Sequence, residues 1–514
     1  MKLFRSTAIV SFFTLLSRIS GLIRDQVVAR LFGAGQWTDV FFVVFRIPNL
    51  MRRLFAEGSF SLAFIPVLNE VKAQKNRQQL KHFVDLIFTA LLVVLLSTLA
   101  LMELFAPGLL NIFAPGFVDQ PEQYGVAVDM LRISLPYMLL ISLVALSGGI
   151  LNSHGKFAIP ALTPILLNLS LIASAIWLRG AFDVPVKSLA YGVLIAGFLQ
   201  LLLQVPFLLR LGMLPRLRLN FKDPYVQKVK RLMLPTLFGS SVAQVNILID
   251  TAIATMLPLV GSISYLYYAD RLMEFPLGVF GIAIATVILP KLSYDFANKQ
   301  DDKLQETIRW AIGLAIIIAI PAAVALAFMA ESVFITLFQY GAFDQKSTYY
   351  SSVALTFYML GLPAFILNKV LLPIFFSRKD VKTPVKVALA VMLLNVVLNL
   401  LFVWVLWTQS FVSLHVGLAL ASSVCAWVQM YLLYRHLRSS KILYAGTFSL
   451  SLIVRVVFAA AVMLLILYLY HFYMPELGEL VWYQRAIHLI AMVASGGLVY
   501  IFTLWLTKPN FRFH

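Results

Sequence analysis

The first 57 residues place many charged side chains within sequence that is apolar enough to cross a membrane. They contain eight basic and three acidic residues. Nine of these lie among runs such as IVSFFTLLS and FFVVF: Arg18, Arg24, Asp25, Arg30, Asp39, Arg46, Arg52, Arg53 and Glu57. An arginine at the centre of a bilayer costs a few kcal/mol, so such residues persist where they face water or protein. The pattern predicts a polar cavity that binds an anion.

Helical spacing groups these charges on shared faces. Four of them follow one another at intervals of 7, 7 and 4 residues, on one face of a helix predicted over 38–69: Asp39, Arg46, Arg53 and Glu57. Arg18 and Asp25 share a face of the preceding helix, and Arg24 points about a quarter-turn away. Arg52 lies off the main stripe. Because basic residues outnumber acidic ones here, we expect the surplus guanidinium groups to bind a phosphate or a carboxylate.

Two other interpretations of these charges stay open. Arg30 and Arg53 can lie at helix ends, with their guanidinium groups reaching the lipid headgroups. The charges can also form an internal network of ion pairs that holds helices together. Asp270, Arg271 and Glu274 lie within one helical turn and could partly neutralise one another.

The composition excludes a soluble globular protein. Of the 514 residues, 61% are hydrophobic and 12% are charged, whereas soluble domains are about half apolar and about a quarter charged. The single cysteine, Cys425, rules out a disulfide within the chain. No P-loop, HExxH or CxxC motif is present and the seven histidines are scattered, so an enzyme is disfavoured. The net charge of +18 is explained by membrane topology and anionic headgroups rather than by nucleic acid.

We therefore expect an all-α polytopic membrane protein with about fourteen transmembrane helices of about twenty apolar residues each. Their predicted ranges are 4–31, 38–69, 83–105, 130–152, 160–178, 188–210, 232–256, 263–289, 308–337, 349–375, 384–406, 414–436, 447–471 and 484–507. The loops at 70–82, 210–231 and 376–386 are basic, whereas 106–129 is acidic. The positive-inside rule then places both termini in the cytoplasm. No small-residue cleavage site follows the first helix, so we expect it to be retained.

The chain repeats itself at an offset of 225 residues. The pairs of identical residues at this offset include Arg46/Arg271, Asp25/Asp250, Asp119/Asp344, Gly192/Gly417, Gln204/Gln429 and Arg210/Arg435. Apolar sequences match easily by chance, but several matches at one offset, anchored on charged residues, indicate a real repeat.

The repeat predicts two lobes of six helices each. An even number of helices returns the chain to the same side of the membrane, so the lobes, 1–215 and 226–440, have the same orientation. In transporters built from such repeats the substrate binds between the halves and access alternates as they rock. The last two helices, within 446–507, lie outside the repeat.

No cofactor is expected, but two sources of energy stay open. An inside-negative membrane potential favours outward movement of an anion. Asp250 with Asn395 and Asn399 would supply oxygen ligands to a monovalent or other hard cation. The simpler interpretation, which we favour, is that Asp250 forms hydrogen bonds within the helix bundle.

Several stretches resemble the MurJ (MviN) family of bacterial lipid II flippases, within the multidrug/oligosaccharidyl-lipid/polysaccharide exporter superfamily. They are SRISGLIRD, LFGAGQWTDVFFVVFRIPNLMRRLFAEGSFSLAFIPVL, YYADRLMEFPLGVFG, LFQYGAF and SRKDVKTPVKVAL. The resemblance runs from residue 1 to about 507. The functionally critical arginines of the family match Arg18, Arg24, Arg52 and Arg271 of this sequence. Further family positions match Asp25, Asp39, Arg53 and Glu57. Arg46 stands where relatives can carry lysine.

The resemblance implies a function and its partners. Lipid II, the undecaprenyl-diphosphate-linked peptidoglycan precursor, would cross the inner membrane through a central cationic cavity, and the last two helices would form a groove for its tail. Other cell-wall synthesis proteins are candidate partners. Two alternatives within the superfamily are a flippase for another polyprenyl-linked glycan and a drug or cation antiporter. The antiporter should have an acid-rich cavity, whereas the one predicted here is basic.

Overall fold

The computed structural model of the chain describes residues 2–53, 59–443 and 448–507. Within these ranges all regular secondary structure is helical, which confirms the predicted all-α class. Contacts divide the chain into two units, Met1–Ile263 and Ser264–His514.

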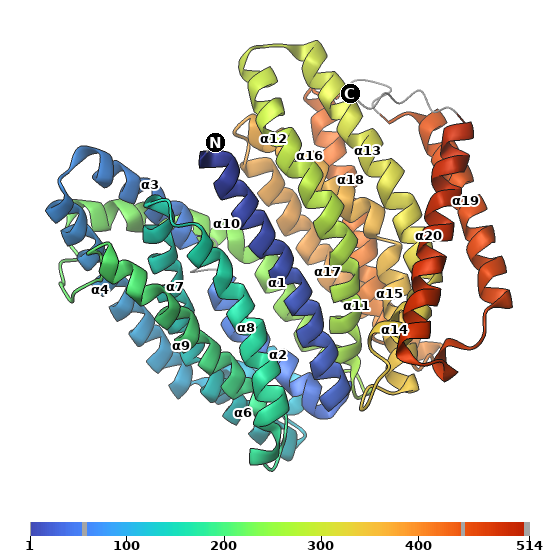
Figure 1. Cartoon of the computed structure of the whole chain (residues 1–514), viewed down its shortest axis with the longest axis horizontal. Coiled ribbons are helices and arrows are strands. Elements are labelled where there is room, and N and C mark those ends of the chain that lie inside the picture. The colour runs from blue at the N-terminus through green and yellow to red at the C-terminus, as the bar shows by residue number, and fades with distance from the viewer. Residues whose placement is uncertain (1, 54–58, 444–447, 508–514) are drawn as a thin grey trace. The chain divides into compact units, whose positions relative to one another are not determined.

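The first unit is built from ten α-helices and two short 3₁₀ turns among the described residues (Figure 1). The helices are α1 (Lys2–Phe32), α2 (Gln36–Met51), α3 (Ser59–Gln74), α4 (Arg77–Leu104), α5 (Ala106–Phe113), α6 (Pro121–Ser134), α7 (Pro136–Ser153), α8 (Ala158–Trp177), α9 (Lys187–Arg210) and α10 (Pro224–Thr255). The 3₁₀ turns are η2 (Pro115–Phe117) and η3 (Arg179–Ala181).

The second unit contains the remaining helices, of which α11 begins just before the boundary. They are α11 (Ser262–Pro276), α12 (Ile282–Ala297), α13 (Asp301–Phe328), α14 (Ala330–Leu337), α15 (Gln345–Met359), α16 (Leu362–Ser377), α17 (Lys382–Thr408), α18 (Val416–Ser439), α19 (Leu450–Tyr473) and α20 (Trp482–Leu506). A π-helical segment, η4 (Leu277–Gly281), joins α11 to α12, and a 3₁₀ turn, η5 (Leu477–Glu479), precedes α20.

Ten helical segments of the described residues are long and apolar enough to cross a membrane, or eleven if the bent pair α15 and α16 forms one span. This confirms a multi-pass membrane protein. Three predicted spans do not pass this test: 4–31, 38–69 and 232–256. They correspond to α1, to α2 with α3, and to α10, which carry most of the candidate polar residues. The exact count of fourteen stays a prediction.

The boundary between the units also differs from the one predicted between the repeats. Contacts group α10 with the first unit, where it packs against α3 and, less extensively, against α4 and α5. The repeat was inferred from residue offsets rather than from packing, so the predicted lobes, 1–215 and 226–440, stay a prediction.

The predicted helix over 38–69 is not one regular α-helix. The α-helix α2 ends at Met51 and residues 52–53 form a wider, π-type turn. Pro48 lies within α2 and lacks the N–H that would continue the ladder of hydrogen bonds. The same irregularity recurs 225 residues later, where α11 ends at Pro276 and η4 follows. The face on which a side chain lies therefore cannot be predicted by counting residues across the end of α2 or the end of α11.

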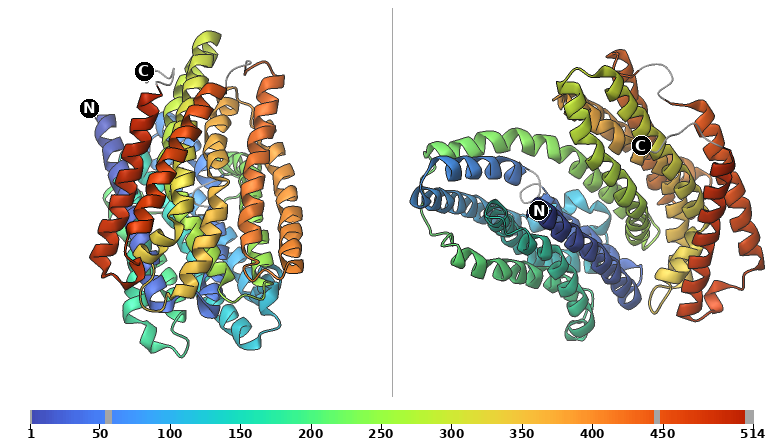
Figure 2. Two further views of the ribbon diagram at one scale, coloured as in Figure 1. Left: turned by 90° about the vertical axis from the view of Figure 1, so that its right-hand side faces the viewer. Right: turned by 45° about the horizontal axis from the view of Figure 1, so that its top comes forward.

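Glycines allow two pairs of consecutive helices to approach closely. A Cβ added to Gly192 of α9 would lie 2.9 Å from the Ser174 Oγ of α8. In the second unit, a Cβ added to Gly417 of α18 would lie 3.2 Å from the Val403 N of α17. The close approach of α8 and α9 fixes the position of α8, which packs against α1 (Figure 2).

Helices α19 and α20 pack side by side at one edge of the second unit (Figures 1 and 2). α19 also packs against α13, and the Tyr500 hydroxyl of α20 donates a hydrogen bond of 2.6 Å to the Ile317 carbonyl of α13. Exposed aromatic side chains lie at both ends of the pair: Phe472, Tyr473, Trp482 and Tyr483 at one end, and Phe502 and Trp505 at the other. Such belts mark the two membrane–water interfaces.

Candidate functional site

A buried polar network surrounds Arg24 on α1. The Arg24 side chain donates from Nε and Nη2 to Asp25 Oδ1, at 2.9 and 2.5 Å. Its Nη1 donates to Asn168 Oδ1 of α8 at 3.2 Å. The Asn168 amide in turn donates to Ser20 Oγ at 2.9 Å and to the Ser17 carbonyl at 3.1 Å. Arg24 and Asp25 are 7% and 3% exposed, so the charge pair is shielded from its surroundings.

This geometry corrects the orientation predicted for Arg24. On an ideal helix Arg24 points away from Asp25, but the guanidinium folds back onto the carboxylate of its neighbour. Helical spacing gives only the direction of the Cα–Cβ bond, and the long arginine side chain can bend away from that direction. Arg24 is therefore not an unpaired cation in this structure, and an anion must compete with Asp25 and Asn168 for it.

Arg18 and Arg30 of α1 contrast with Arg24. Both side chains are exposed, and neither forms a hydrogen bond or an ion pair with another described residue. Among the side chains of α1 that the structure describes, 9–32, these two arginines carry positive charge without a carboxylate partner, and Arg18 shares a helix face with Asp25.

Two charged side chains of α2 contact α10 or the loop that follows it. The buried Asp39 accepts a hydrogen bond of 2.9 Å from the Gly261 N–H. Arg46, half-buried, donates from Nη1 to the Thr251 hydroxyl of α10. Each contact joins residues more than 200 positions apart in the sequence, so the first unit uses α2 charges to hold α10 and its C-terminal loop.

The remaining charges near the end of α2 are less fully described. Arg52 donates from Nε to the Asn49 Oδ1 at 2.9 Å, one turn earlier. Arg53 is half-buried, and Glu57 lies outside the described residues. Because the α-helix ends at Met51, the predicted common face that joins Asp39 and Arg46 to Arg53 does not extend along one regular α-helix.

The residues proposed for a cation are each joined to a nearby amide. Asp250 Oδ2 accepts a hydrogen bond of 3.2 Å from Asn246, one turn earlier on α10. Asn399 donates to Asn395 Oδ1 at 3.0 Å on α17, and both side chains are buried. Among the described residues no group of three or more His, Cys, Asp or Glu side chains could hold a metal ion.

In the second unit, Arg271 of α11 has a carboxylate partner. Its Nη1 lies 3.1 Å from Glu274 Oε2, one turn later, and its guanidinium lies 6.0 Å from the centre of the Tyr267 ring. About a third of the Arg271 side chain and nearly half of that of Glu274 are exposed. This pair is therefore far more accessible than that of Arg24.

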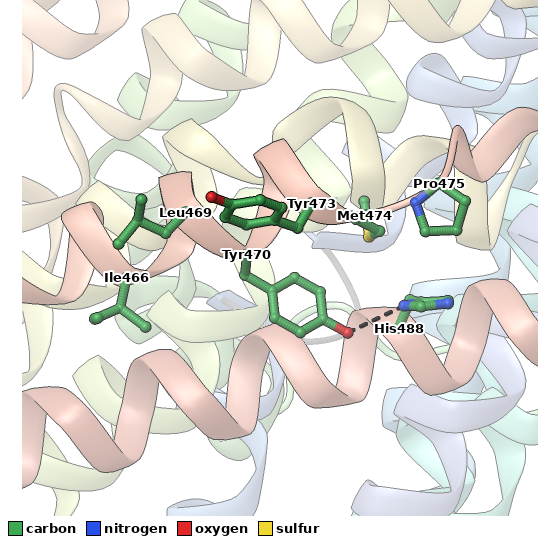
Figure 3. Close-up of a pocket in the computed structure, with 7 residues that line it drawn as sticks. All are labelled: Ile466, Leu469, Tyr470, Tyr473, Met474, Pro475 and His488. Atoms are coloured by element: carbon green, nitrogen blue, oxygen red, sulfur yellow. Dashed lines mark hydrogen bonds between the residues drawn. The ribbon is translucent and has the colours of Figure 1, made fainter.

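A pocket of about 460 Å³ lies between α19 and α20. Its lining is mostly apolar and aromatic: Ile466, Leu469, Tyr470, Tyr473, Met474, Pro475 and His488. Figure 3 shows the Tyr470 hydroxyl directed toward His488, and a hydrogen bond of 3.0 Å joins it to Nδ1 of that histidine. The pocket lies at the end of the helix pair that carries Tyr473 and Trp482, which is one of the two membrane interfaces.

Sequence reasoning missed the residues that hold the predicted charges. Asn168, Thr251 and Gly261 contact Arg24, Arg46 and Asp39 from distant parts of the chain. The one available signal was a buried amide within an apolar helix, since Asn168 lies in the run ILLNLSLI. Polar side chains inside transmembrane helices usually pair with one another.

The fold defines the class first. This is an all-α multi-pass membrane protein. Its fold is similar to that of a multidrug resistance transporter of the MATE family in the MOP superfamily, solved in an inward-facing conformation (TM-score 0.65, 16% identity, 85% of this chain and 98% of that chain).

The family model described as "Lipid II flippase MurJ" matches residues 28–485, and the chain belongs to this family. A probable lipid II flippase MurJ of Vibrio cholerae is 41% identical over 90% of this chain and 88% of its own length. The lipid II flippase MurJ of Burkholderia cenocepacia is 39% identical over 90% of this chain and 89% of its own. A solved lipid II flippase MurJ in an inward closed conformation matches with a TM-score of 0.79 at 26% identity, covering 97% of this chain and 98% of that chain.

Proposed function

We propose that this protein moves lipid II from the cytoplasmic to the periplasmic leaflet of the bacterial inner membrane by alternating access. Membership of the lipid II flippase family supports the substrate. The observation that carries the proposal is the buried guanidinium of Arg24, which the side chains of Asp25 and Asn168 hold within a membrane protein. Like other members of a transporter family, the protein would act without catalysing a chemical reaction.

The Asp25 carboxylate acts as a counterion that the substrate replaces. A diphosphate offers more oxygen acceptors and more negative charge than a single carboxylate, and the guanidinium fork matches it bidentately. Arg24 would then leave Asp25 and Asn168 when lipid II enters, and return to them when lipid II leaves. In the absence of substrate, this network allows Arg24 to stay charged while it is buried. An arginine with no partner could not be buried in this way.

The other candidate residues would bind or orient the charged headgroup of the substrate. We assign this role to Arg18, Arg52, Arg271, Asp39, Arg46, Arg53 and Glu57, with Arg24 and Asp25. Arg18, exposed and without a described partner, would attract the anion first. Arg271, beside the accessible Glu274, would need the smallest rearrangement to exchange its carboxylate for a substrate phosphate.

The polyprenyl tail would stay in the lipid and lie against α19 and α20. Moving it into water would cost about 0.8 kcal/mol for each methylene exposed. The apolar and aromatic lining of the pocket between these helices supports such a role, and its position at the interface would suit the segment of tail nearest the diphosphate.

We propose that the protein acts without a cofactor. We also propose that the inside-negative membrane potential assists export, because the headgroup is anionic. Coupling to a monovalent cation would require Asp250, Asn395 and Asn399 to exchange their present amide partners for the ion. Both termini would lie in the cytoplasm, on the side of the basic loops. Membrane lipids surround the protein, and enzymes of cell-wall synthesis would supply or consume its substrate; nucleic acid would not bind.

The test is transport of lipid II by the purified protein in liposomes. A water-soluble enzyme that degrades lipid II from outside reports how much of the lipid has crossed. We expect Arg24→Ala and Arg271→Ala to abolish crossing at normal membrane insertion. The control, Arg179→Ala, changes an exposed arginine in η3 and should transport normally. Full activity of both arginine variants would contradict the role assigned to them.

The rival function is drug or cation antiport within the same superfamily. The same liposomes distinguish it, because an antiporter would move an organic cation against a sodium or proton gradient and leave lipid II where it is. A second rival, a membrane glycosyltransferase, would form polymer from labelled lipid II.

A further inference from the structure

The connection between α9 and α10, residues 211–223, has a feature that the transport function does not use. Its residues 213–220 adopt no regular helix or strand. Within this connection polar side chains, three of them cationic, alternate with apolar ones: Arg216, Leu217, Arg218, Leu219, Asn220, Phe221 and Lys222. All seven are exposed, and the apolar ones strongly so, with Leu217 at 71%, Leu219 at 61% and Phe221 at 42%.

Hydrogen bonds show that this connection runs along α4 toward the membrane. Arg77 at the start of α4 donates to the Leu211 carbonyl at 2.8 Å. The Arg216 N–H donates to Asp85 Oδ1 and the Arg218 N–H to Thr89 Oγ1, both at 2.8 Å. The partners on α4 thus advance from residue 77 to 85 and 89, about 18 Å at 1.5 Å per residue. Figure 1 shows the connection beside α4.

The depth that the connection reaches follows from the sequence of α4. The first turns of this helix, RQQLKHFVD, are polar, and a long apolar run begins at Leu86. Asp85 and Thr89 therefore lie where α4 enters the hydrocarbon, and the connection is held at the level of the headgroups and the first methylenes.

Asp85 anchors this arrangement. Its side chain is 2% exposed and accepts the Arg216 N–H, and it also pairs with Lys81. Arg218 Nε lies 3.8 Å from its other oxygen. A buried carboxylate bonded in this way fixes the backbone of the connection at a set depth.

The backbone geometry separates the two kinds of side chain. The N–H groups of Arg216 and Arg218 both face α4, as those of alternate residues do in an extended chain. Side chains of successive residues then point in opposite directions. By this alternation Leu217 and Leu219 share one side, and Arg216 and Arg218 share the other, where Arg218 Nη1 lies 3.1 Å from His82.

We propose that this connection is a membrane-interface anchor for anionic phospholipids. Leu217, Leu219 and Phe221 enter the boundary of the acyl chains, while Arg216, Arg218 and Lys222 bind the phosphates of the headgroups. Charge complementarity favours an anionic leaflet, and the alternation of apolar and cationic side chains requires an apolar phase beside a negative one. The anchor is independent of which substrate the protein transports.

The first test measures the depth of single spin labels in vesicles of phosphatidylglycerol and phosphatidylethanolamine. Labels are introduced by Leu217→Cys, Arg218→Cys, Leu219→Cys and Asn220→Cys in the full chain, whose native Cys425 is buried at 4% exposure. We expect positions 217 and 219 to be accessible to oxygen, and positions 218 and 220 to a water-soluble nickel chelate. Equal accessibility to the chelate at all four positions would overturn the proposal.

The second test measures thermal stabilisation of the detergent-solubilised protein by phosphatidylglycerol. Arg216→Gln and Arg218→Gln should each raise the phosphatidylglycerol concentration needed for thermal stabilisation by about fivefold, because each cation contributes a similar share of the attraction to an anionic surface. Arg179→Gln, at an exposed arginine in the α8–α9 connection, is the matched control and should leave the response unchanged. Equal losses in all three variants would contradict the proposal. So would full stabilisation by inorganic phosphate, since that would indicate a free-phosphate site.

Discussion

Arg24 and Arg485 are both arginines whose guanidinium groups are fully engaged, but their partners differ in kind. In the first unit, Arg24 is bound by a carboxylate and an amide side chain. In the second, Arg485 at the start of α20 donates to four backbone carbonyls. They belong to Leu480 and Gly478 at 2.8 and 2.7 Å, and to Ile335 and Gln339 at 3.3 and 3.2 Å. The guanidinium also lies 5.2 Å from the centre of the Tyr340 ring.

The difference separates a binding role from a structural one. Side-chain partners can rotate away when a stronger acceptor arrives, and Asp25 carries the same sign of charge as the proposed substrate. Backbone carbonyls at the C-terminal end of α14 and in the turn before α20 cannot leave without unfolding those elements. Arg485 satisfies carbonyls that a helix end leaves unpaired and interacts favourably with its dipole. We therefore propose that arginine serves substrate exchange at Arg24 and helix docking at Arg485.

The sharpest test of this comparison is to remove both members of the charge pair. Arg24→Ala takes the guanidinium away from the buried Asp25 carboxylate, and breaking a buried ion pair in this way costs about 3–5 kcal/mol of stability. Adding Asp25→Asn should recover most of this stability because no charge then remains. Transport should stay at least about a hundredfold below that of the unaltered protein in both variants, a change of about 2.7 kcal/mol in the barrier. Recovery of transport with stability would show that the pair only holds helices together.

The converse test removes Arg485. Arg485→Ala should lower the free energy of unfolding by about 2 kcal/mol, because four carbonyls, three of them in partly buried contacts, lose their donor. Lysine cannot bond four separated carbonyls as the planar fork does, so Arg485→Lys should be intermediate. Thermal unfolding measures the loss, and transport per folded molecule should be unchanged. A transport defect in a fully stable Arg485→Ala variant would place this residue in the substrate path.

The sequence was sufficient for the fold class and the family, because these depend on composition and on local motifs, whereas the role of Arg24 in binding stays a prediction. It could not supply the partners of Arg24. Asn168 is 144 residues away, and only the packing of α8 on α1 brings it near. The pairing with Asp25 was missed for another reason, since spacing on an ideal helix ignores how far an arginine side chain can reach.

The second limit on prediction from the sequence is that real helices contain irregular turns. A helix over 38–69 fits the apolar pattern, yet the α-helix ends at Met51 and residues 52–53 form a π-type turn, where ideal helical spacing no longer holds. Pro48 signals that a distortion occurs nearby but not where it falls. Predictions that combine residues before and after such a point, as for Asp39 and Arg53, carry this error.

A smaller effect is expected at Asn168, which positions Arg24 without carrying charge. Asn168→Ala should lower transport about tenfold, because Arg24 loses one acceptor and its orientation relaxes. Asn168→Asp should lower it further by adding a second carboxylate that competes with the substrate. The matched control is Asn368→Ala, which removes a buried amide that donates to the Ala426 carbonyl of α18. Initial rates at several lipid II concentrations would distinguish weaker binding from a general loss of folded protein, and equal defects at both asparagines would contradict a specific role.

The smallest expected effect is at Asp380, which resembles Arg485 with the charges reversed, because here a carboxylate binds backbone N–H groups at a helix start. Its Oδ1 accepts the Thr383 N–H of α17 at 3.0 Å, and this hydrogen bond holds the pKa of Asp380 below its usual range. Asp380→Ala should cost at most about 1 kcal/mol at neutral pH. Since the pKa is lower in the folded state, the stabilisation is complete above the unfolded value of about 3.9 and is lost as the pH falls through the folded one. The thermal midpoints of the unaltered protein and of Asp380→Ala should therefore converge on acidification. Asp380→Asn keeps a neutral hydrogen-bond acceptor at this position, so the difference between its midpoint and that of Asp380→Ala should not change with pH. If the difference between the unaltered protein and Asp380→Ala did not change with pH, the charge of Asp380 would contribute nothing to the stability of this helix start.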